Sequence, residues 1–289
     1  MLRRLLRPTN RRVRVVVGLF LAGLFCVQCA PTEALVESKD VVVISGRDFG
    51  RNAPEIAARI EQLAKTDHIS LLEYCLANYS SSYRDLRCTL IKQERIDGRC
   101  RPQQTIDVKH MTSPFSVAMA WTKNPPAGDR VVFVEGRNNN QMLVRPQNEL
   151  LRALVGGSVL RQPDGKEALR SALRPVNMFG FGRALESLIS VYRKAQTQGD
   201  LKTAHTYAKV GGRKCIVLMR YLPAKDDYPA YKTFIYIDVE YLAPIRIEAY
   251  DWDGRLQSLY DYRNIKFNVG LSEDDFTPQA NGIAVGKTP

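Results

Sequence analysis

The chain has 289 residues, with 42 lysines and arginines against 30 acidic residues, a formal net charge of +12. Its 45% hydrophobic content and lack of repeats exclude a disordered or fibrous protein and suit one sizeable domain. The basic residues are scattered and no run of them alternates with aromatic residues. The sequence therefore argues against a nucleic-acid partner and leaves attraction to an anionic membrane surface open.

Residues 1–34 have the pattern of an export signal. Six arginines precede an apolar run at 15–27, and Thr32-Glu33-Ala34 offers a cleavage site, with Val27-Gln28-Cys29 as a second choice. The alternative is an uncleaved membrane anchor, which needs about 20 apolar residues. We predict an exported protein of the periplasm or cell envelope, either released by cleavage or retained by this anchor. Cleavage would remove six arginines and one glutamate, leaving 36 basic and 29 acidic residues and a formal charge of +7.

Residues 35–62 are predicted to form a helical leader, and residues 63–289 to form the main domain. Apolar residues recur at helical spacing from Ile56 to Ala64 and again from Leu71 to Tyr79. This spacing indicates two helices or one broken helix.

From Tyr83 onward the apolar period changes to two, which is typical of strands. Asp97-Gly98 predicts a tight hairpin turn between strands at 86–90 and 105–110, and Asp253-Gly254 predicts another. An irregular insertion at 146–174 leads to a helix around 185–192, and residues 203–207 form a strand or turn. Further strands are predicted at 115–121, 130–134, 141–144, 214–222, 231–238, 245–250 and 255–267.

These elements predict an α+β fold. The total is about nine strands, some before and some after one helical block. Several of these strands are apolar on both faces, which favours a strongly curved antiparallel sheet. We expect it to be unclosed and barrel-like, with helices covering its concave face. Such a sheet encloses either a ligand cavity or a solid core, and the sequence leaves both open.

One predicted strand has two different faces. Phe115, Val117, Met119 and Trp121 alternate with serine and alanine, so the four large side chains share one face. We expect this face on the concave side, beneath the helix around 185–192. The candidate ligand-binding residues are Phe115, Val117, Met119, Trp121, Phe133, Phe234 and Tyr236.

Several passages together resemble an exported bacterial family known as domain of unknown function 1571. They are Leu86 to Gly98, Pro114 to Val117, Met119-Ala120-Trp121, Val134 to Asn139, and Arg174 to Asn177 ahead of Gly180-Phe181-Gly182. The likeness runs over roughly residues 63–276, and the family has no known activity to transfer.

The C-terminal third is more remotely similar to periplasmic lipoprotein carriers and outer-membrane lipoprotein-sorting proteins. The residues concerned are Ile237-Asp238, Leu242, Pro244 to Arg246, Tyr250 to Gly254 and Phe276. The resemblance implies an unclosed antiparallel barrel, covered by helices, whose concave face holds acyl chains.

No catalytic constellation is apparent, so the protein is not expected to be an enzyme. His68, His110 and His205 are isolated, which favours surface or interfacial roles over a metal site. Asp251 with Asp253, and Asp274 with Asp275, are expected in turns rather than in an acid–base pair. No metal or cofactor is predicted.

Four cysteines follow the export signal: Cys75, Cys88, Cys100 and Cys215. Two disulfides or four buried free thiols are both compatible with this number. The turn at Asp97-Gly98 would place Cys88 opposite Asp107 and Cys100 opposite Arg95, which disfavours a bond between these two cysteines.

We expect a monomeric, non-catalytic carrier or binding protein for a lipid, a lipoprotein or another apolar component of the cell envelope. The alternative is a structural or interaction protein with a solid core and no small ligand. A hydrolase of envelope polymers is a distant third reading, because no serine has the setting of a nucleophile.

Overall fold

The computed structural model describes residues 40–50 and 54–284. The predicted export signal lies outside these residues. Among the helices described, none is long and apolar enough to span a membrane.

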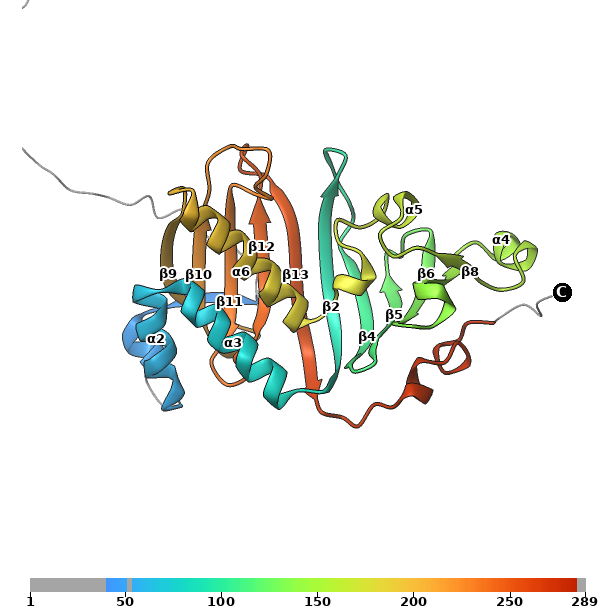
Figure 1. Cartoon of the computed structure of the whole chain (residues 1–289), viewed down its shortest axis with the longest axis horizontal. Coiled ribbons are helices and arrows are strands. Elements are labelled where there is room, and N and C mark those ends of the chain that lie inside the picture. Colours follow the sequence, from blue (N-terminus) through green and yellow to red (C-terminus); the bar gives the residue numbers. More distant parts are fainter. Residues whose placement is uncertain (1–39, 51–53, 285–289) are drawn as a thin grey trace, which may run out of the picture. The chain divides into compact units, whose positions relative to one another are not determined.

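Thirteen strands of the described chain form one antiparallel sheet (Figure 1). Their order is β1-β9-β10-β11-β12-β13-β2-β4-β5-β6-β7-β8, and β3 pairs only with β2. The chain thus builds two runs of neighbouring strands, which meet where β13 pairs with β2. The bounds are β1 Val41–Ile44, β2 Asp85–Ile96, β3 Arg99–Cys100, β4 Gln104–Thr112, β5 Phe115–Lys123, β6 Gly128–Val134, β7 Met142–Pro146, β8 Val159–Arg161, β9 Lys202–Val210, β10 Arg213–Tyr221, β11 Lys232–Asp238, β12 Pro244–Tyr250 and β13 Leu256–Phe267.

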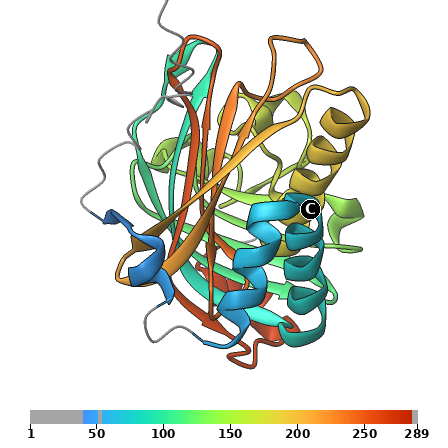
Figure 2. The same ribbon diagram turned by 90° about the vertical axis from the view of Figure 1, so that its left-hand side faces the viewer.

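Three helices pack on one face of the sheet, which we call the inner face (Figures 1 and 2). The helices of the described residues are α1 Gly46–Gly50, α2 Ile56–Thr66, α3 His68–Ser82, α4 Glu149–Leu154, α5 Lys166–Leu169 and α6 Phe181–Thr197. Helices α2, α3 and α6 lie over β9–β13. Leu185 and Leu188 of α6 are buried in one core with Ile216 of β10 and Ile235 of β11.

The junction between α2 and α3 is fixed by Asp67. Its backbone is extended, and its carboxylate accepts hydrogen bonds from the backbone N–H groups of Ile69 and Ser70 at 3.0 and 3.1 Å. Such a side-chain cap satisfies N–H groups at the start of a helix that have no partner within it. Of the two predicted alternatives, the structure therefore has two helices rather than one broken helix.

The C-terminal segment, residues 268–284, covers part of the opposite, outer face. Leu271, Phe276 and Ile283 form a second buried cluster with side chains of β4 to β7, among them Ala118 and Val132. The outer face of this half of the sheet is consequently covered by the C-terminal segment.

The predicted α+β class, with an unclosed, curved antiparallel sheet and helices on its concave face, is confirmed. The turn at Asp97-Gly98 pairs Ile96 with Arg99 as predicted. Cys88, however, lies opposite Val108 rather than Asp107, because one extra residue between β3 and β4 shifts the register. Cys100 does lie opposite Arg95.

Two regions differ from the sequence expectation. The insertion at 146–174 is not irregular throughout, since it contains α4, β8 and α5. Within the predicted leader, β1 pairs with β9 and α2 packs against β10, so both elements belong to the sheet domain.

Two of the three histidines are buried between elements of the fold, so of the expected surface or interfacial roles only the interfacial one applies to them. His68 is 6% exposed, and its Nε2 donates a hydrogen bond to the carbonyl oxygen of Ala64 at 3.0 Å. His110 is 2% exposed, and its Nδ1 donates a hydrogen bond to the carbonyl oxygen of Ser116 at 3.0 Å. Burial lowers the pKa of each imidazole to about 4, although these hydrogen bonds act in the opposite direction.

The hairpin between β12 and β13 depends on Gly254, whose φ is +75°. An added Cβ would meet nothing within 4 Å, so only backbone strain opposes a larger residue. We predict that Gly254→Val lowers the free energy of unfolding by about 1–3 kcal/mol, measured by urea denaturation. Gly254→Asn is the matched control and should cost less, since asparagine tolerates this conformation. Equal losses in the two variants would contradict the assignment.

A second prediction concerns acid stability. Between pH 6.5 and about 4 the unfolded chain binds protons at His68 and His110 that the folded chain does not, so stability falls as pH falls through this range. The expected loss is about 2 kcal/mol per histidine between pH 7 and pH 5. His110→Gln should reduce the loss between these two pH values, measured by urea denaturation. A loss as large as in the unmodified protein would show that His110 does not titrate in this way.

Candidate functional site: a pocket on the inner face

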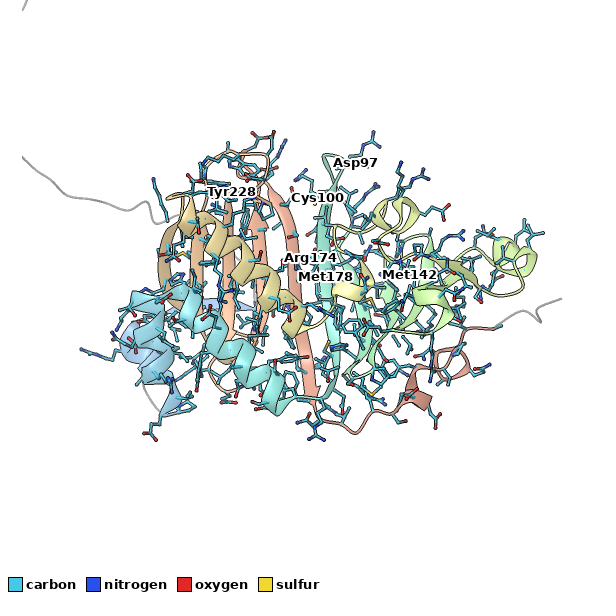
Figure 3. The ribbon with its side chains drawn as sticks, in the orientation of Figure 1. Asp97, Cys100, Met142, Arg174, Met178 and Tyr228 are labelled. Carbon is cyan, nitrogen blue, oxygen red and sulfur yellow. The ribbon has the colours of Figure 1, made fainter. Side chains whose placement is uncertain are left out.

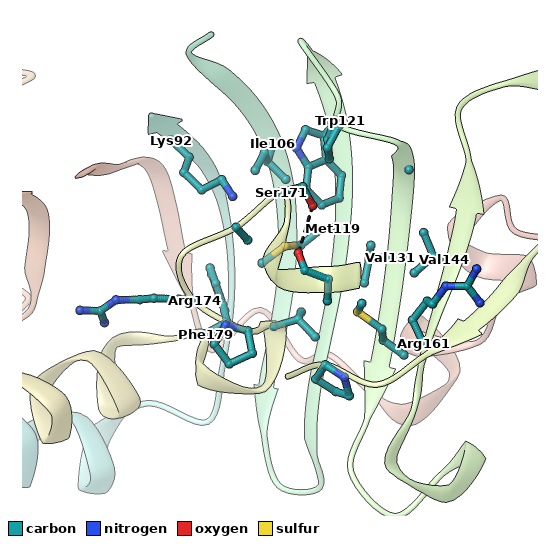
Figure 4. Close-up of a pocket in the computed structure, with 18 of the residues that line it drawn as sticks. Lys92, Ile106, Met119, Trp121, Val131, Val144, Arg161, Ser171, Arg174 and Phe179 are labelled. Atoms are coloured by element: carbon teal, nitrogen blue, oxygen red, sulfur yellow. Dashed lines mark hydrogen bonds between the residues drawn. The ribbon is translucent and has the colours of Figure 1, made fainter. Parts of the chain in front are cut away.

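A pocket of about 560 Å³ lies on the inner face, over the half of the sheet that α2 and α3 do not cover (Figure 4). Its floor is formed by strands β2, β4, β5, β6 and β7, with residues of β8, β12 and β13 at its sides. A segment at 163–180, which we call the covering segment, lies over it. Its floor and side residues include Leu90, Ile106, Met119, Trp121, Val131, Met142, Val144, Val159, Ile247, Tyr260 and Tyr262.

Strand register explains why the floor is apolar. Leu90, Ile106 and Trp121 are direct neighbours across β2, β4 and β5. Met119, Val131 and Val144 form a second such row across β5, β6 and β7. Because side chains two residues apart share a face, each strand contributes its large apolar residues to the same side.

The polar side chains near the floor are paired with one another. Glu94 is 3% exposed; its carboxylate accepts from the Tyr260 hydroxyl at 2.6 Å and pairs with the Lys92 ammonium at 3.1 Å. The Trp121 indole N–H donates to the Gln104 side-chain oxygen at 2.9 Å. The buried polar groups thus satisfy each other, and the pocket presents a mainly apolar surface to an occupant.

The covering segment is held at both ends. At its start Arg161 of β8 forms an ion pair with Glu167 of α5. At its end Phe179 is 8% exposed and packs edge-on against His110, with ring centroids 5.6 Å apart. Gly180 follows with φ +99°, and an added Cβ there would lie 2.8 Å from Nε2 of His110. Only glycine fits this close approach, which sets the start of α6.

The structure separates the predicted ligand-binding residues into three groups. Met119 and Trp121 line the pocket. Phe115, Val117 and Phe133 lie on the same inner face but are buried in the main core, and the Phe115 and Phe133 rings are 6.1 Å apart.

Phe234 and Tyr236 are misassigned in the sequence prediction, because they lie on the outer face of β11. Their neighbours on β12 are Glu248 and Arg246, whereas Ile235 and Ile237 point into the inner core. Both faces of β11 are apolar, so alternation alone did not indicate which one faces inward.

The element above Met119 and Trp121 also differs from the prediction. It is the covering segment, while the helix that contains Leu185 and Leu188 lies mainly over β10–β13. No function was predicted for this segment, and the lining residues Arg161, Arg170 and Arg174 were not predicted from the sequence. Its sequence, in which Pro163 and Pro175 enclose several small and basic residues, shows no sustained helical or strand periodicity.

The remaining candidate groups have structural roles. Asp251 accepts hydrogen bonds from the backbone of Asp253 and Arg255 within a turn, and Asp275 takes part in a capping box with Ser272. Within residues 40–50 and 54–284, no group of three or more histidine, cysteine or acidic residues is placed to hold a metal ion. The four cysteines in the part of the chain that the structure describes are free thiols: Cys75, Cys88 and Cys215 are buried and Cys100 is exposed.

The sequence model of one family, described as "Protein of unknown function (DUF1571)", matches residues 83–283. No curated protein matches the sequence. This finding supplies no activity, so the function has to be argued from the pocket.

Several solved structures are similar in fold. A chain of the Pseudomonas aeruginosa MucA/MucB complex is 14% identical, with 77% of this chain and 64% of that chain covered and a TM-score of 0.44. A LolA superfamily protein from Nitrosomonas europaea is 13% identical, with 73% and 97% covered and a TM-score of 0.31. The Mycobacterium tuberculosis lipoprotein LppX is 11% identical, with 71% and 99% covered and a TM-score of 0.35. At these identities the likeness concerns the fold alone.

Proposed function

We propose that this chain, which belongs to the DUF1571 family of proteins of unknown function, is a non-catalytic binding protein for a lipid or another apolar component of the cell envelope. The observation that carries the proposal is the pocket on the inner face. Its volume of about 560 Å³ falls within the range of small-molecule sites, roughly 300–1,000 Å³.

The chemistry of the lining supports an apolar occupant. The two rows across β2 to β7 present aliphatic, thioether and indole groups, while Glu94, Lys92 and Tyr260 are engaged with one another. An alkyl chain would remove apolar surface from water on both sides, at roughly 25 cal/mol per Å². Export to the periplasm or cell envelope, expected from residues 1–34, would bring the protein into contact with such molecules.

A second candidate is an interaction protein that docks through α4. Leu150 and Leu154 lie one helical turn apart and are 72% and 75% exposed, although leucines on a short surface helix usually face a core. This candidate would take precedence if the protein bound no amphiphile while Leu150→Ser with Leu154→Ser abolished a cross-link to an envelope protein.

The proposal predicts opposite effects for two substitutions on the same face of β5. Met119→Trp should fill the pocket, so that binding of a fluorescent fatty acid is lost while the free energy of unfolding changes by less than about 1.5 kcal/mol. Val117→Phe is the matched control. Val117 is 0% exposed in the packed core, so the added bulk should cost about 1–3 kcal/mol.

Fluorescence titration and urea denaturation of the three proteins separate the possibilities. The proposal requires binding by the unmodified protein and by folded Val117→Phe, but not by Met119→Trp. No binding by the unmodified protein, together with strong destabilisation by Met119→Trp, would indicate a close-packed interior without a ligand.

A further inference from the structure

The pocket carries an excess of positive charge. Its charged lining residues are Lys92, Arg161, Arg170 and Arg174, against Glu94 and Glu167. Lys92 pairs with Glu94, and Arg161 pairs with Glu167. This leaves two guanidinium groups, those of Arg170 and Arg174, without a carboxylate partner in the described part of the chain.

Arg174 lies where the covering segment approaches α6 (Figure 3). Its guanidinium carbon is 5.6 Å from the centroid of the Tyr260 ring, while the Tyr260 hydroxyl is already bonded to Glu94. Figure 4 shows this guanidinium at the edge of the pocket, pointing away from Met119 and Val131. Its N–H donors are thus placed at the rim, beyond the apolar floor.

A third guanidinium, that of Arg220 on β10, does not line the pocket but lies beneath α6, with its central carbon 5.0 Å from the centroid of the Tyr192 ring. Arg220 is 2% exposed; its Nη2 donates to the Thr233 hydroxyl at 3.0 Å, but Nε and Nη1 have no partner among the described residues. Burial lowers the pKa of Arg220, and the charge of Arg174 acts in the same direction, so the two cations interact electrostatically. Arginine nevertheless stays protonated in proteins, and a buried charge without a counter-ion is costly.

We propose that the occupant of the pocket is an acyl chain that ends in an acidic headgroup, either a carboxylate or a phosphate. The chain lies along the apolar floor, and Arg174 binds the headgroup at the rim, with Arg170 and Arg220 contributing positive potential. A guanidinium donates two parallel hydrogen bonds to such oxygens, and these charge-assisted bonds are about twice as strong as neutral ones. This inference rests on the proposed function, because it names the chemical class of ligand for the same pocket.

A neutral amphiphile fits the observations less well. It would fill the apolar floor equally but would leave the Arg174 and Arg220 charges without a counter-ion. An acidic headgroup supplies that counter-ion at Arg174, whose side chain is exposed, so the attraction acts through direct charge-assisted hydrogen bonds and is weakened by salt.

The test compares ligands that share one acyl chain. Oleate, oleoyl lysophosphatidate and oleyl alcohol are titrated against a neutral fluorescent probe, below their aggregation concentrations, using the unmodified protein, Arg174→Gln and Arg193→Gln. Arg193 is the matched control, because it lies on α6, pairs with Glu73 and does not line the pocket. At least one acidic ligand should bind roughly tenfold or more tightly than the alcohol. Arg174→Gln should remove most of this difference, and Arg193→Gln should preserve it.

Arg220→Met gives a second readout, which separates a loss of ligand affinity caused by the missing charge from one caused by lower protein stability. It deletes a buried charge that lacks a counter-ion, so the thermal unfolding midpoint should not fall, yet binding of the acidic ligand should weaken several-fold. Equal affinity for the acids and the alcohol would overturn this inference and leave the apolar-ligand proposal standing. Binding of none of the three ligands would overturn both.

Discussion

The inner face of the sheet is apolar from β10 to β7, and all of it must be kept from water. Alternation with a period of two places Ile216, Ile235, Ile247, Leu90 and Val131 on this side. Helices α2, α3 and α6 cover the part formed by β9–β13 and pack there as a solid core. The remaining part has only the covering segment above it, and the pocket results from this incomplete cover.

Because the inner face is kept from water, each polar group on it needs a partner within the protein or in a ligand. Beneath the covering segment, Glu94, Lys92 and Tyr260 form a self-contained group, so they do not require water or a polar ligand. Arg220 and Arg174 are different, because the described residues give neither a carboxylate partner. The molecule therefore combines an apolar interior with an unbalanced positive charge at one side, which is the arrangement expected for an acidic amphiphile.

The sequence predicted those features that depend on local periodicity and turn chemistry. Asp97-Gly98, the alternation from Phe115 to Trp121 and the two N-terminal helices were sufficient for the class of fold. The faces of β11 could not be told apart, because Phe234 and Tyr236 are bulky and largely apolar, as Ile235 and Ile237 are, and only tertiary packing decides between them. The covering segment was not predicted either. Its conformation depends on long-range anchors such as Phe179 against His110, not on any repeat within it.

The most direct test of the account is a crystal structure of the protein with a fatty acid that carries bromine at its methyl end. The anomalous signal of bromine locates the end of the chain independently of any fitted density. The account predicts a single strong peak over the floor, among Met119, Val131, Met142 and Val144, with the carboxylate towards Arg174. A pocket without bromine at saturating ligand, or peaks confined to the molecular surface, would contradict it.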